Sequence, residues 1–526
     1  MWEEMSKAYE NGAKDYWLLN VGDIKPGELG MATFLDMAWN MDRFNSSSIN
    51  DHQPELLASF FGDKYLKDIK YILDRYYQLG FQHKPEAMGW GWEWNSKRAT
   101  EKVVDTDFSV TNYNEIESRL ESYDEIASMA ESILNSLPKE LHAPFFELVY
   151  YPVKGAGLMN KKMLTAQLSR WHAAKGNAIA NHYADMAKAC HDSIAAITDE
   201  YNSMLGGKWN KMMAQAPGWV ATYQNMPPVR TIEVPLTGKL QIAVPGQDHI
   251  GANVLPYASP LVEQDAYIDL FNTGKTPISW TITASATWLT PSSEKGTADM
   301  HQRIRLDIDW DRVPAGMHTA EIAFMTTSGQ KESVFVPVYK PENITKSNLK
   351  GLYVEHNGCV SMNAASPSRI FDNDDVKISV LEGLGYDGNC LQLGNANGRH
   401  PSTYDLTAAC RAEYDFYTFG SGSVTVYAYA LPVFPLTSAD RTRFGLMIDD
   451  GDVKYISNDA KEYSGEWRDN VARNASVKSV TLNVDKPGKH TLKLICADPG
   501  MVIQKLVIDM GGMKRSYLGA PSTLVL

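Results

Sequence analysis

Cysteine is scarce in this chain, with five residues among 526, at positions 190, 359, 390, 410 and 496. The odd count and the wide spacing fit neither a zinc site nor a dense disulfide scaffold. Four of the five lie in the last third of the chain, where one or two bridges could form in an oxidising compartment. Buried free thiols are the alternative, because unpaired cysteine packs as a small apolar residue.

Long apolar runs are also missing. No stretch reaches the roughly 18 residues that a membrane-spanning helix needs, so no membrane partner is expected. The N-terminus does not read as a signal peptide, because residues 1–7 form an amphipathic helical pattern with Glu3 and Glu4 near its start.

Positive charge is in deficit, with 50 Lys and Arg against 63 Asp and Glu, a formal net charge of −13. Nucleic-acid binding requires a basic face, so a nucleic-acid partner is not expected. The common catalytic signatures are absent too: the chain has no G-x-S-x-G, no phosphate-binding P-loop and no H-E-x-x-H. We therefore expect no metal and no cofactor.

The first 45 residues carry the most informative pattern. Residues 16–20 (Tyr-Trp-Leu-Leu-Asn) predict a short buried strand, and a polar turn follows at residues 21–26. A lone buried strand has no ladder partner, so either it completes a sheet on a segment outside this chain or it is not a strand. A strand tip that carries Asn20, Asp23 and Lys25 is typical of a (β/α)₈ barrel, which presents binding groups there.

The apolar period changes from helical to alternating near residues 227–228, and a polar linker divides the alternating part, which predicts a multidomain α+β protein. Residues 1–45 are expected to be the C-terminal end of a (β/α)₈ barrel, and residues 46–226 a helical bundle, from their 3.6-residue apolar stripes. Alternating apolar residues then predict an immunoglobulin-like β-sandwich over 227–342 and a second β-sandwich over 350–526, joined by a polar linker.

Several motifs together resemble glycoside hydrolase family 115, whose members are xylan α-1,2-glucuronidases. The motifs occur in family order at residues 20–26, 34–40, 84–86, 148–154, 158–160 and 206–213. The resemblance implies β-sandwich domains downstream, a xylan-type polysaccharide or oligosaccharide as substrate, inverting hydrolysis and a homodimer. It also implies a periplasmic or extracellular location for a full-length parent, of which this chain would be the C-terminal portion.

Asp23 is the carboxylate best placed for catalysis, because it follows a glycine at the expected carboxyl end of a barrel strand. A turn cap is its alternative role, since aspartate favours turns. Asn20 could bond a sugar hydroxyl or only local backbone. Lys25 could pair with a glucuronate carboxylate or be an ordinary loop lysine.

Further substrate contacts are predicted on the following helices and loops. Trp39 and Asn40 end a helical pattern, and Trp39 could equally belong to the core. The tryptophan-rich segment 90–95 could stack on sugar rings or pack against the barrel. The residues proposed from this region are Lys84, Glu86, Trp92 and Asn95.

The competing hypothesis comes from a different functional class. Most of the barrel and at least one catalytic carboxylate are not evident in the sequence. The chain could therefore be a non-catalytic carbohydrate-binding or assembly polypeptide, and on either hypothesis we expect the chain alone to be inactive.

Overall fold

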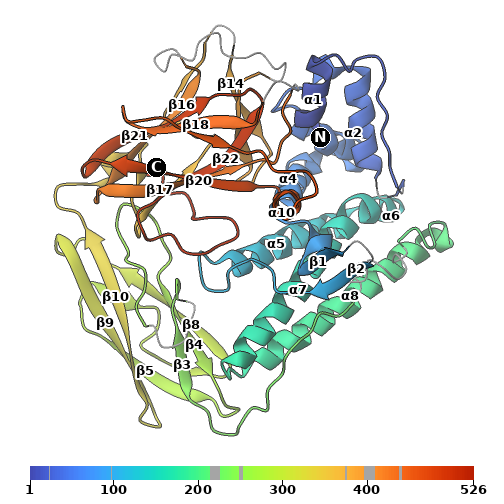
Figure 1. The fold of residues 1–526 in the computed structure, drawn as a ribbon. Helices are drawn as coiled ribbons and strands as arrows, with labels where there is room; N and C mark the ends of the chain where they lie inside the picture. Colours follow the sequence, from blue (N-terminus) through green and yellow to red (C-terminus); the bar gives the residue numbers. More distant parts are fainter. Residues whose placement is uncertain are drawn as a thin grey trace.

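The computed structural model describes residues 1–22, 24–25, 27–95, 98–213, 225–247, 253–373, 376–395, 409–436 and 441–526. The chain is a multidomain α+β protein. Figure 1 shows the helical part, formed by the N-terminal segments, on one side and two β-sandwiches along the other.

The N-terminal region is helical, with no strand among its described residues. Its elements are α1 (Trp2–Glu10), α2 (Glu28–Trp39), η1 (Met41–Arg43), α3 (Ile49–Phe61), η2 (Asp63–Tyr65), α4 (Leu66–Gln82) and η3 (Pro85–Ala87). Residues 16–20, expected as a buried strand, pair with no described strand, and Tyr16 and Leu18 are 78% and 77% exposed. That this segment completes a sheet on a segment outside this chain stays a prediction. A strand without a neighbour leaves its backbone groups unpaired, which makes an isolated strand unfavourable in this chain.

The bundle is built on three long helices, α5 (Glu115–Ser136), α7 (Tyr151–Ala174) and α8 (Ile179–Gly207). The turns η4 (Lys139–Leu141) and α6 (His142–Phe145) lead into a π-helical segment, η5 (Phe146–Tyr150). Side chains from α3, α4, α5 and α7 share one apolar core that includes Leu57, Ile72 and Ile126. Near its end α8 leaves helical geometry at Met204, Leu205 and Gly206, where the Gly-Gly pair allows positive φ angles.

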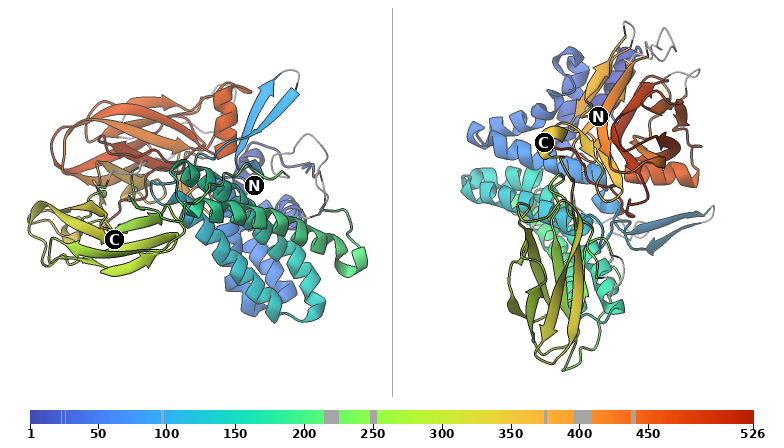
Figure 2. Two further views of the ribbon diagram at one scale, coloured as in Figure 1. Left: turned by 90° about the horizontal axis from the view of Figure 1, so that it is seen from below. Right: turned by 90° about the vertical axis from the view of Figure 1, so that its left-hand side faces the viewer.

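One antiparallel hairpin interrupts the helical region, which the sequence pattern had assigned to helices and loops alone. Strand β1 (Trp90–Asn95) pairs with β2 (Arg98–Val103), with Trp90 opposite Val103. Figure 2 shows this hairpin standing clear of the bundle. Aromatic residues favour strands, and this propensity outweighs the helical context of the flanking segments.

The first β-sandwich consists of two four-stranded sheets, ordered β10-β9-β5-β7 and β3-β4-β8-β6. Inward-facing side chains such as Trp280, Ile322 and Val336 form its core, as the period of two requires. The strands are β3 (Leu240–Ala243), β4 (Tyr267–Asn272), β5 (Ile278–Ala284), β6 (Leu289–Pro291), β7 (Lys295–Ala298), β8 (His301–Ile308), β9 (Gly316–Thr326) and β10 (Lys331–Lys340).

A short helix, α9 (Lys346–Leu349), leads into the second sandwich, whose sheets run β11-β16-β21-β18-β19 and β14-β15-β22-β17-β20. Strand β13 pairs with β16 and strand β12 with β22 at the sides of these sheets. The strands are β11 (Tyr353–Val354), β12 (Cys359–Asn363), β13 (Arg369–Phe371), β14 (Ile378–Glu382), β15 (Asn389–Leu393), β16 (Arg411–Thr418), β17 (Gly422–Ala430), β18 (Arg443–Ile448), β19 (Lys454–Ser457), β20 (Ser476–Val484), β21 (Gly488–Cys496) and β22 (Met501–Asp509); helix α10 (Gly465–Arg473) precedes β20.

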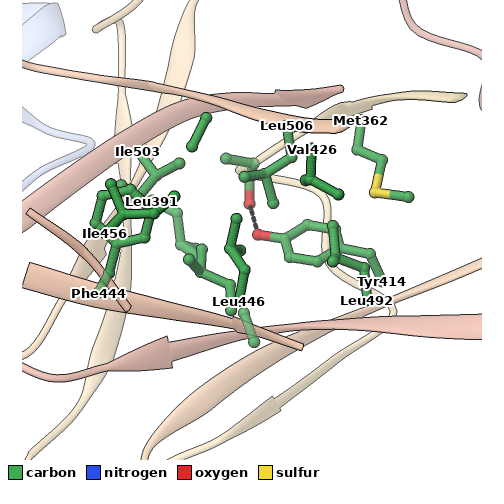
Figure 3. Close-up of a cluster of buried hydrophobic side chains, with 14 of the residues drawn as sticks. Met362, Leu391, Tyr414, Val426, Phe444, Leu446, Ile456, Leu492, Ile503 and Leu506 are labelled. Atoms are coloured by element: carbon green, nitrogen blue, oxygen red, sulfur yellow. Dashed lines mark hydrogen bonds between the residues drawn. The ribbon is translucent and has the colours of Figure 1, made fainter. Parts of the chain in front are cut away.

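The core of the second sandwich holds a polar anchor. Figure 3 shows Leu446, Leu492 and Leu506 packed around Tyr414. The Tyr414 hydroxyl donates to the Ala364 carbonyl at 2.6 Å, which satisfies the one polar atom of this fully buried ring. Cys410 and Cys496 belong to the same core, and all five cysteines are buried free thiols.

Two further findings concern the described part of the chain. No helix there is both long enough and apolar enough to cross a membrane. No three His, Cys, Asp or Glu side chains there lie close enough together to hold a metal ion.

Candidate active site

Lys25 lies at the centre of a charged cluster where the turn before α2 meets the bundle. Its ammonium group forms ion pairs with Glu28 and with Glu147, and it lies over the Trp209 ring, 4.5 Å from the ring centroid. The side chains of Lys25 and Glu147 are 14% and 8% exposed, so the lysine is largely withdrawn from water. The cluster joins segments that are 122 residues apart in the sequence.

Local structure explains how each cluster residue reaches this place. Glu28 is the first residue of α2, where a carboxylate complements the helix dipole. Glu147 belongs to the π-helical segment η5, and such segments often occur at functional sites. Tyr201 precedes the break in α8, and Trp209 follows it. Three motif segments, residues 20–26, 148–154 and 206–213, therefore meet at or beside one cluster.

The charges of the cluster shift one another's pKa values. Burial opposes ionisation of Lys25, but hydrogen bonds to Glu147 and Glu28 hold its pKa above the usual value. Burial raises the pKa of Glu147, and the nearby Glu28 adds to this. For Glu28, burial is outweighed by the hydrogen bond from Lys25, so its pKa is lowered. Burial and the neighbouring Glu147 raise the pKa of Tyr201.

The geometry restricts what this pair of carboxylates can do. An inverting glycosidase needs its two carboxyl groups about 6.5–9.5 Å apart, with room for a water molecule and the sugar between them. Glu28 and Glu147 both contact the same ammonium nitrogen, so they lie closer together than that. They can fix the position and the charge of Lys25, but they cannot act together as the acid and the base of that mechanism.

The sequence-predicted residues near Lys25 are only partly described. Asp23 lies outside the described residues. Asn20 and Asn40 are exposed, and Trp39 is 91% exposed at the end of α2, so it does not belong to the core. A contact between Asp36 and His52 joins α2 to α3: Asp36 Oδ2 lies 2.7 Å from Nε2 of the buried His52.

The predicted residues after α4 fall into a different part of the molecule. The Lys84 ammonium donates to the Val471 carbonyl at 3.1 Å and lies 3.5 Å from Asn474 Oδ1, at the end of α10 in the second sandwich. The backbone of Glu86 lies in η3, and the backbones of Trp92 and Asn95 lie in β1. The side chains of these three residues are outside the described part, so their roles as sugar contacts stay predictions.

Sequence reasoning missed Glu147, Tyr201 and Trp209 as parts of this cluster. Two of them lie at motifs of the family resemblance: Glu147 directly precedes the motif at residues 148–154, and Trp209 lies within the motif at residues 206–213. The recurrence of aromatic and charged residues in those segments was the available signal. Nothing local could indicate that they meet Lys25, because the contact depends on how α7 and α8 pack.

Comparison with known proteins adds two family-level matches. A model described as the glycosyl hydrolase family 115 C-terminal domain matches residues 352–522, and one described as glycosyl hydrolase family 115 matches residues 1–87. No curated protein matches the chain.

Among solved structures, a family 115 4-O-methyl-α-glucuronidase with specificity for decorated arabinogalactans matches with a TM-score of 0.61 and 23% identity. The match covers 96% of this chain and 47% of that one, so this chain spans about half the length of its relative. At this identity the likeness concerns the fold alone.

Two carbohydrate-binding modules match more weakly. A CBM6 from a laminarinase of Zobellia galactanivorans has a TM-score of 0.19 and 16% identity, over 29% of this chain and 98% of the module. A CBM35 from Cellvibrio japonicus has a TM-score of 0.20 and 14% identity, over 28% and 91%. Scores of this size carry no weight for fold or for function.

Proposed function

The chain belongs to glycoside hydrolase family 115, and from that premise we propose that it is part of an enzyme that removes (4-O-methyl)glucuronic acid from a decorated polysaccharide. Xylan is the substrate that the motifs favour, and the arabinogalactan specificity of the solved relative makes a decorated arabinogalactan the second choice. We further propose inverting hydrolysis, a homodimer and a periplasmic or extracellular location.

This proposal rests on one charged cluster, in which Lys25 contacts Glu28, Glu147 and Trp209. A glucuronate carboxylate is anionic, and an acidic protein must supply fixed positive charge to meet it. Lys25 is held in its charged form by Glu28 and Glu147, so a glucuronate carboxylate would reach its ammonium by displacing one of them. The Trp209 ring offers an apolar face of the kind on which sugars stack. Asp23 and Asn20 lie within five residues of Lys25 in the sequence.

A non-catalytic polypeptide that binds carbohydrate or assembles with a partner is the second candidate. One observation favours it: both described carboxylates beside Lys25 are engaged by its ammonium, and this leaves Asp23 as the one catalytic carboxylate proposed. The two candidates differ in turnover, because only an enzyme releases free glucuronic acid.

We expect the 526-residue chain alone to release no 4-O-methylglucuronic acid from glucuronoxylan. The measurement is the release of free acid over time, with a characterised family 115 glucuronidase as the positive control. Turnover by the chain alone would contradict the expected inactivity and would favour the enzyme hypothesis for this chain as it stands. Binding of acidic xylo-oligosaccharides without turnover would favour the second candidate.

Asp23→Asn tests the catalytic role in a form of the protein that releases 4-O-methylglucuronic acid. The change keeps the shape and removes the charge, so a general acid or base at this position would lose about 100-fold or more in kcat. A turn cap would be almost unaffected, because Asn caps nearly as well as Asp. Wild-type kinetics would remove Asp23 from the site, and a joint loss of rate and melting temperature would indicate a structural carboxylate.

A further inference from the structure

Two of the five cysteines face each other across neighbouring strands of the second sandwich. Strand β16 pairs with β21 in antiparallel register, with Arg411 opposite Ile495. One residue further out, Cys410 therefore lies opposite Cys496, and the Cys496 backbone N–H donates to the Cys410 carbonyl at 3.0 Å. The glucuronidase function proposed above uses neither cysteine.

Both side chains enter the same side of the sheet, as directly opposite residues of an antiparallel pair must. This side is the inner one, because Cys410 and Cys496 belong to the apolar core of the second sandwich and are 0% and 3% exposed. The neighbouring Ala409 and Ile495 belong to a separate cluster with Met447, as the alternation along a strand requires. The two thiols are therefore adjacent in one layer of the core.

The backbone spacing of such a pair suits a disulfide. Opposite residues joined by a ladder hydrogen bond have Cα atoms about 5.5 Å apart, and disulfides span about 4.4–6.8 Å between Cα atoms. Their Cβ atoms lie about 4.5–5.5 Å apart, so a small approach of the strands brings them to the disulfide distance of about 3.5–4.5 Å. The Cys496 sulfur now lies 3.7 Å from the Asp498 carbonyl, so bond formation also requires a rotation about its Cα–Cβ bond.

The other three cysteines lack such a partner. Cys359 lies opposite Asp509 in the ladder of β12 and β22, and Cys390 lies opposite Leu381 in the ladder of β14 and β15. Cys190 is on helix α8 of the bundle. These three are placed as small apolar residues. The cross-strand position distinguishes Cys410 and Cys496 from them.

Oxidation of this pair belongs to folding rather than to the finished fold. Burial raises the pKa of the Cys410 thiol to about 12 and raises that of the Cys496 thiol as well, so the nucleophilic thiolate is scarce in the folded chain. Cys410 directly precedes the first residue of β16, and the ends of elements open more readily than their centres. A disulfide donor therefore reaches Cys410 while the sandwich assembles or when this end frays.

We propose that Cys410 and Cys496 form a cross-strand disulfide when the chain folds in the presence of a disulfide donor, either oxidised glutathione or a thiol–disulfide oxidoreductase. The Cys410 thiolate attacks one sulfur of the donor, and the other donor sulfur leaves as a thiolate. The Cys496 thiolate then attacks the Cys410 sulfur of this mixed disulfide and releases the second donor thiolate. The two cysteines lose two electrons and two protons in total, and the donor takes them up as two thiols.

The bridge would stabilise the second sandwich. It closes the chain from residue 410 to residue 496, a segment that holds the strands from β16 to β21, and so restricts the unfolded state. A loop of this length lies near the upper end of the stabilisation that disulfides give, which corresponds to a rise of at least about 5 °C in the melting temperature. Contact with a donor rests on the proposed periplasmic or extracellular location, but the bond itself does not depend on the glucuronidase function.

Two preparations of the full chain test this proposal. One is made in a reducing bacterial cytoplasm, and the other is exported to the periplasm, where disulfides form. Alkylation followed by mass spectrometry without reduction should find five free thiols in the first and three in the second, with the peptides of Cys410 and Cys496 linked. The reduced preparation, opened in moderate urea with oxidised glutathione and returned to buffer, should acquire the same link.

Thermal melting with and without dithiothreitol then measures the effect of the bond within each variant, so that a lower baseline stability cancels. Cys410→Ala and Cys496→Ala should each abolish the difference of about 5 °C or more. Cys390→Ala is the matched control, because Cys390 is as fully buried as Cys410 but has no cysteine opposite it, and this variant should keep the difference.

Five free thiols after both oxidising treatments would overturn the proposal. So would a bridge between other cysteines, glutathione attached to one cysteine without a link to the second, or a dithiothreitol-sensitive difference that persists in Cys410→Ala. The mass measurement on the wild-type chain decides the matter even if a variant fails to fold. Because no turnover is measured, failure of the glucuronidase hypothesis would not change this result.

Discussion

At the scale of single residues, the Lys25 cluster is the most consequential feature of the molecule. One ammonium group pairs with two carboxylates that would otherwise face each other in a poorly hydrated place, and it offsets one of their two negative charges. Removing one partner of such a group leaves a buried charge unpaired, which destabilises more than the intact interaction stabilises. The cluster should therefore be sensitive both to substitution and to pH.

Lys25→Met should lower the free energy of unfolding at pH 7 by about 2 kcal/mol. Without the cation, Glu28 and Glu147 repel each other, and the folded-state pKa values of both rise above the unfolded values. Such groups contribute stability below the unfolded pKa and lose it as pH rises, so the deficit should shrink as pH falls toward about 4.5. Urea denaturation at pH 7 and pH 5 measures the difference.

Lys161→Met is the matched control for this experiment. Lys161 pairs with Asp124 at 2.8 Å on the surface, where Asp124 is 60% exposed. Surface pairs of this kind contribute less than about 1 kcal/mol. A deficit in Lys25→Met that is no larger than in Lys161→Met, or that does not change with pH, would contradict the role assigned to the cluster.

The sequence indicated one member of this cluster, Lys25. Asn20, Asp23 and Lys25 stand out because three polar residues follow a short apolar run. Glu147 gives no such signal, because its contact with Lys25 depends on the π-helical turn of η5 and on the packing of α7. For Lys84 the motif predicts a sugar contact, and no sequence signal indicates that its ammonium also bonds the Val471 carbonyl at the end of α10.

At the scale of elements, long periodic segments were predictable and short aromatic ones were not. The helical period around residues 158–205 corresponds to α7 and α8, and the alternating segments near 424, 444, 480 and 488 correspond to β17, β18, β20 and β21. Residues 16–20 and 90–95 have similar aromatic content, but only the second has a partner, β2, and only the second forms a strand. The presence of a partner is not visible in a local pattern.

The start of α5 fastens the bundle to the second sandwich through Glu115. This buried carboxylate accepts three backbone N–H groups, from Ser109 at 2.8 Å, Tyr517 at 3.0 Å and Leu518 at 2.7 Å. Burial raises the pKa of Glu115, and these hydrogen bonds pull it back toward the ionised form. The carboxylate therefore serves both as a helix-end charge and as a link between domains.

Glu115→Gln should destabilise the chain by about 2 kcal/mol, because the amide nitrogen would face a backbone N–H that now has no acceptor. Chemical denaturation measures the loss, and amide exchange of Tyr517 and Leu518 should accelerate with it. Glu121→Gln, at an exposed position of the same helix, is the control and should change stability by less than about 0.5 kcal/mol. Equal effects of the two substitutions would contradict this role for Glu115.

At the scale of the whole molecule, the domains are tied by specific polar contacts. Gln78 and Gln82 on α4 donate to the Tyr386 carbonyl of the second sandwich at 2.9 and 2.7 Å. The Ala178 backbone N–H donates to the Asn272 carbonyl of the first sandwich at 2.9 Å. Composition and periodicity predicted separate bodies, but these contacts join residues up to 308 positions apart and could not be read from the sequence.

An ion pair made by Arg303 on β8 also ties the first sandwich to the bundle. Its guanidinium pairs with Asp269 of the same sheet through two hydrogen bonds, at 2.9 and 3.0 Å, and donates to Glu117 of α5 at 2.6 Å. It also covers the face of Tyr267. An arginine suits this position because its planar group can serve both carboxylates and stack on the ring at the same time.

We therefore expect the wild-type chain to unfold in one calorimetric transition, with the first sandwich coupled to the bundle. Arg303→Met removes the link to Glu117 and leaves Asp269 with only His301, 2.8 Å away, so the sandwich should melt separately and earlier. Arg312→Met is the control, because Arg312 pairs at 3.2 Å with Asp309 inside the sandwich and is 65% exposed. If the sandwich already melts separately in the wild type, the coupling through Arg303 does not exist. If Arg303→Met lowers a single transition without splitting it, Arg303 stabilises the sheet itself rather than the contact between the domains.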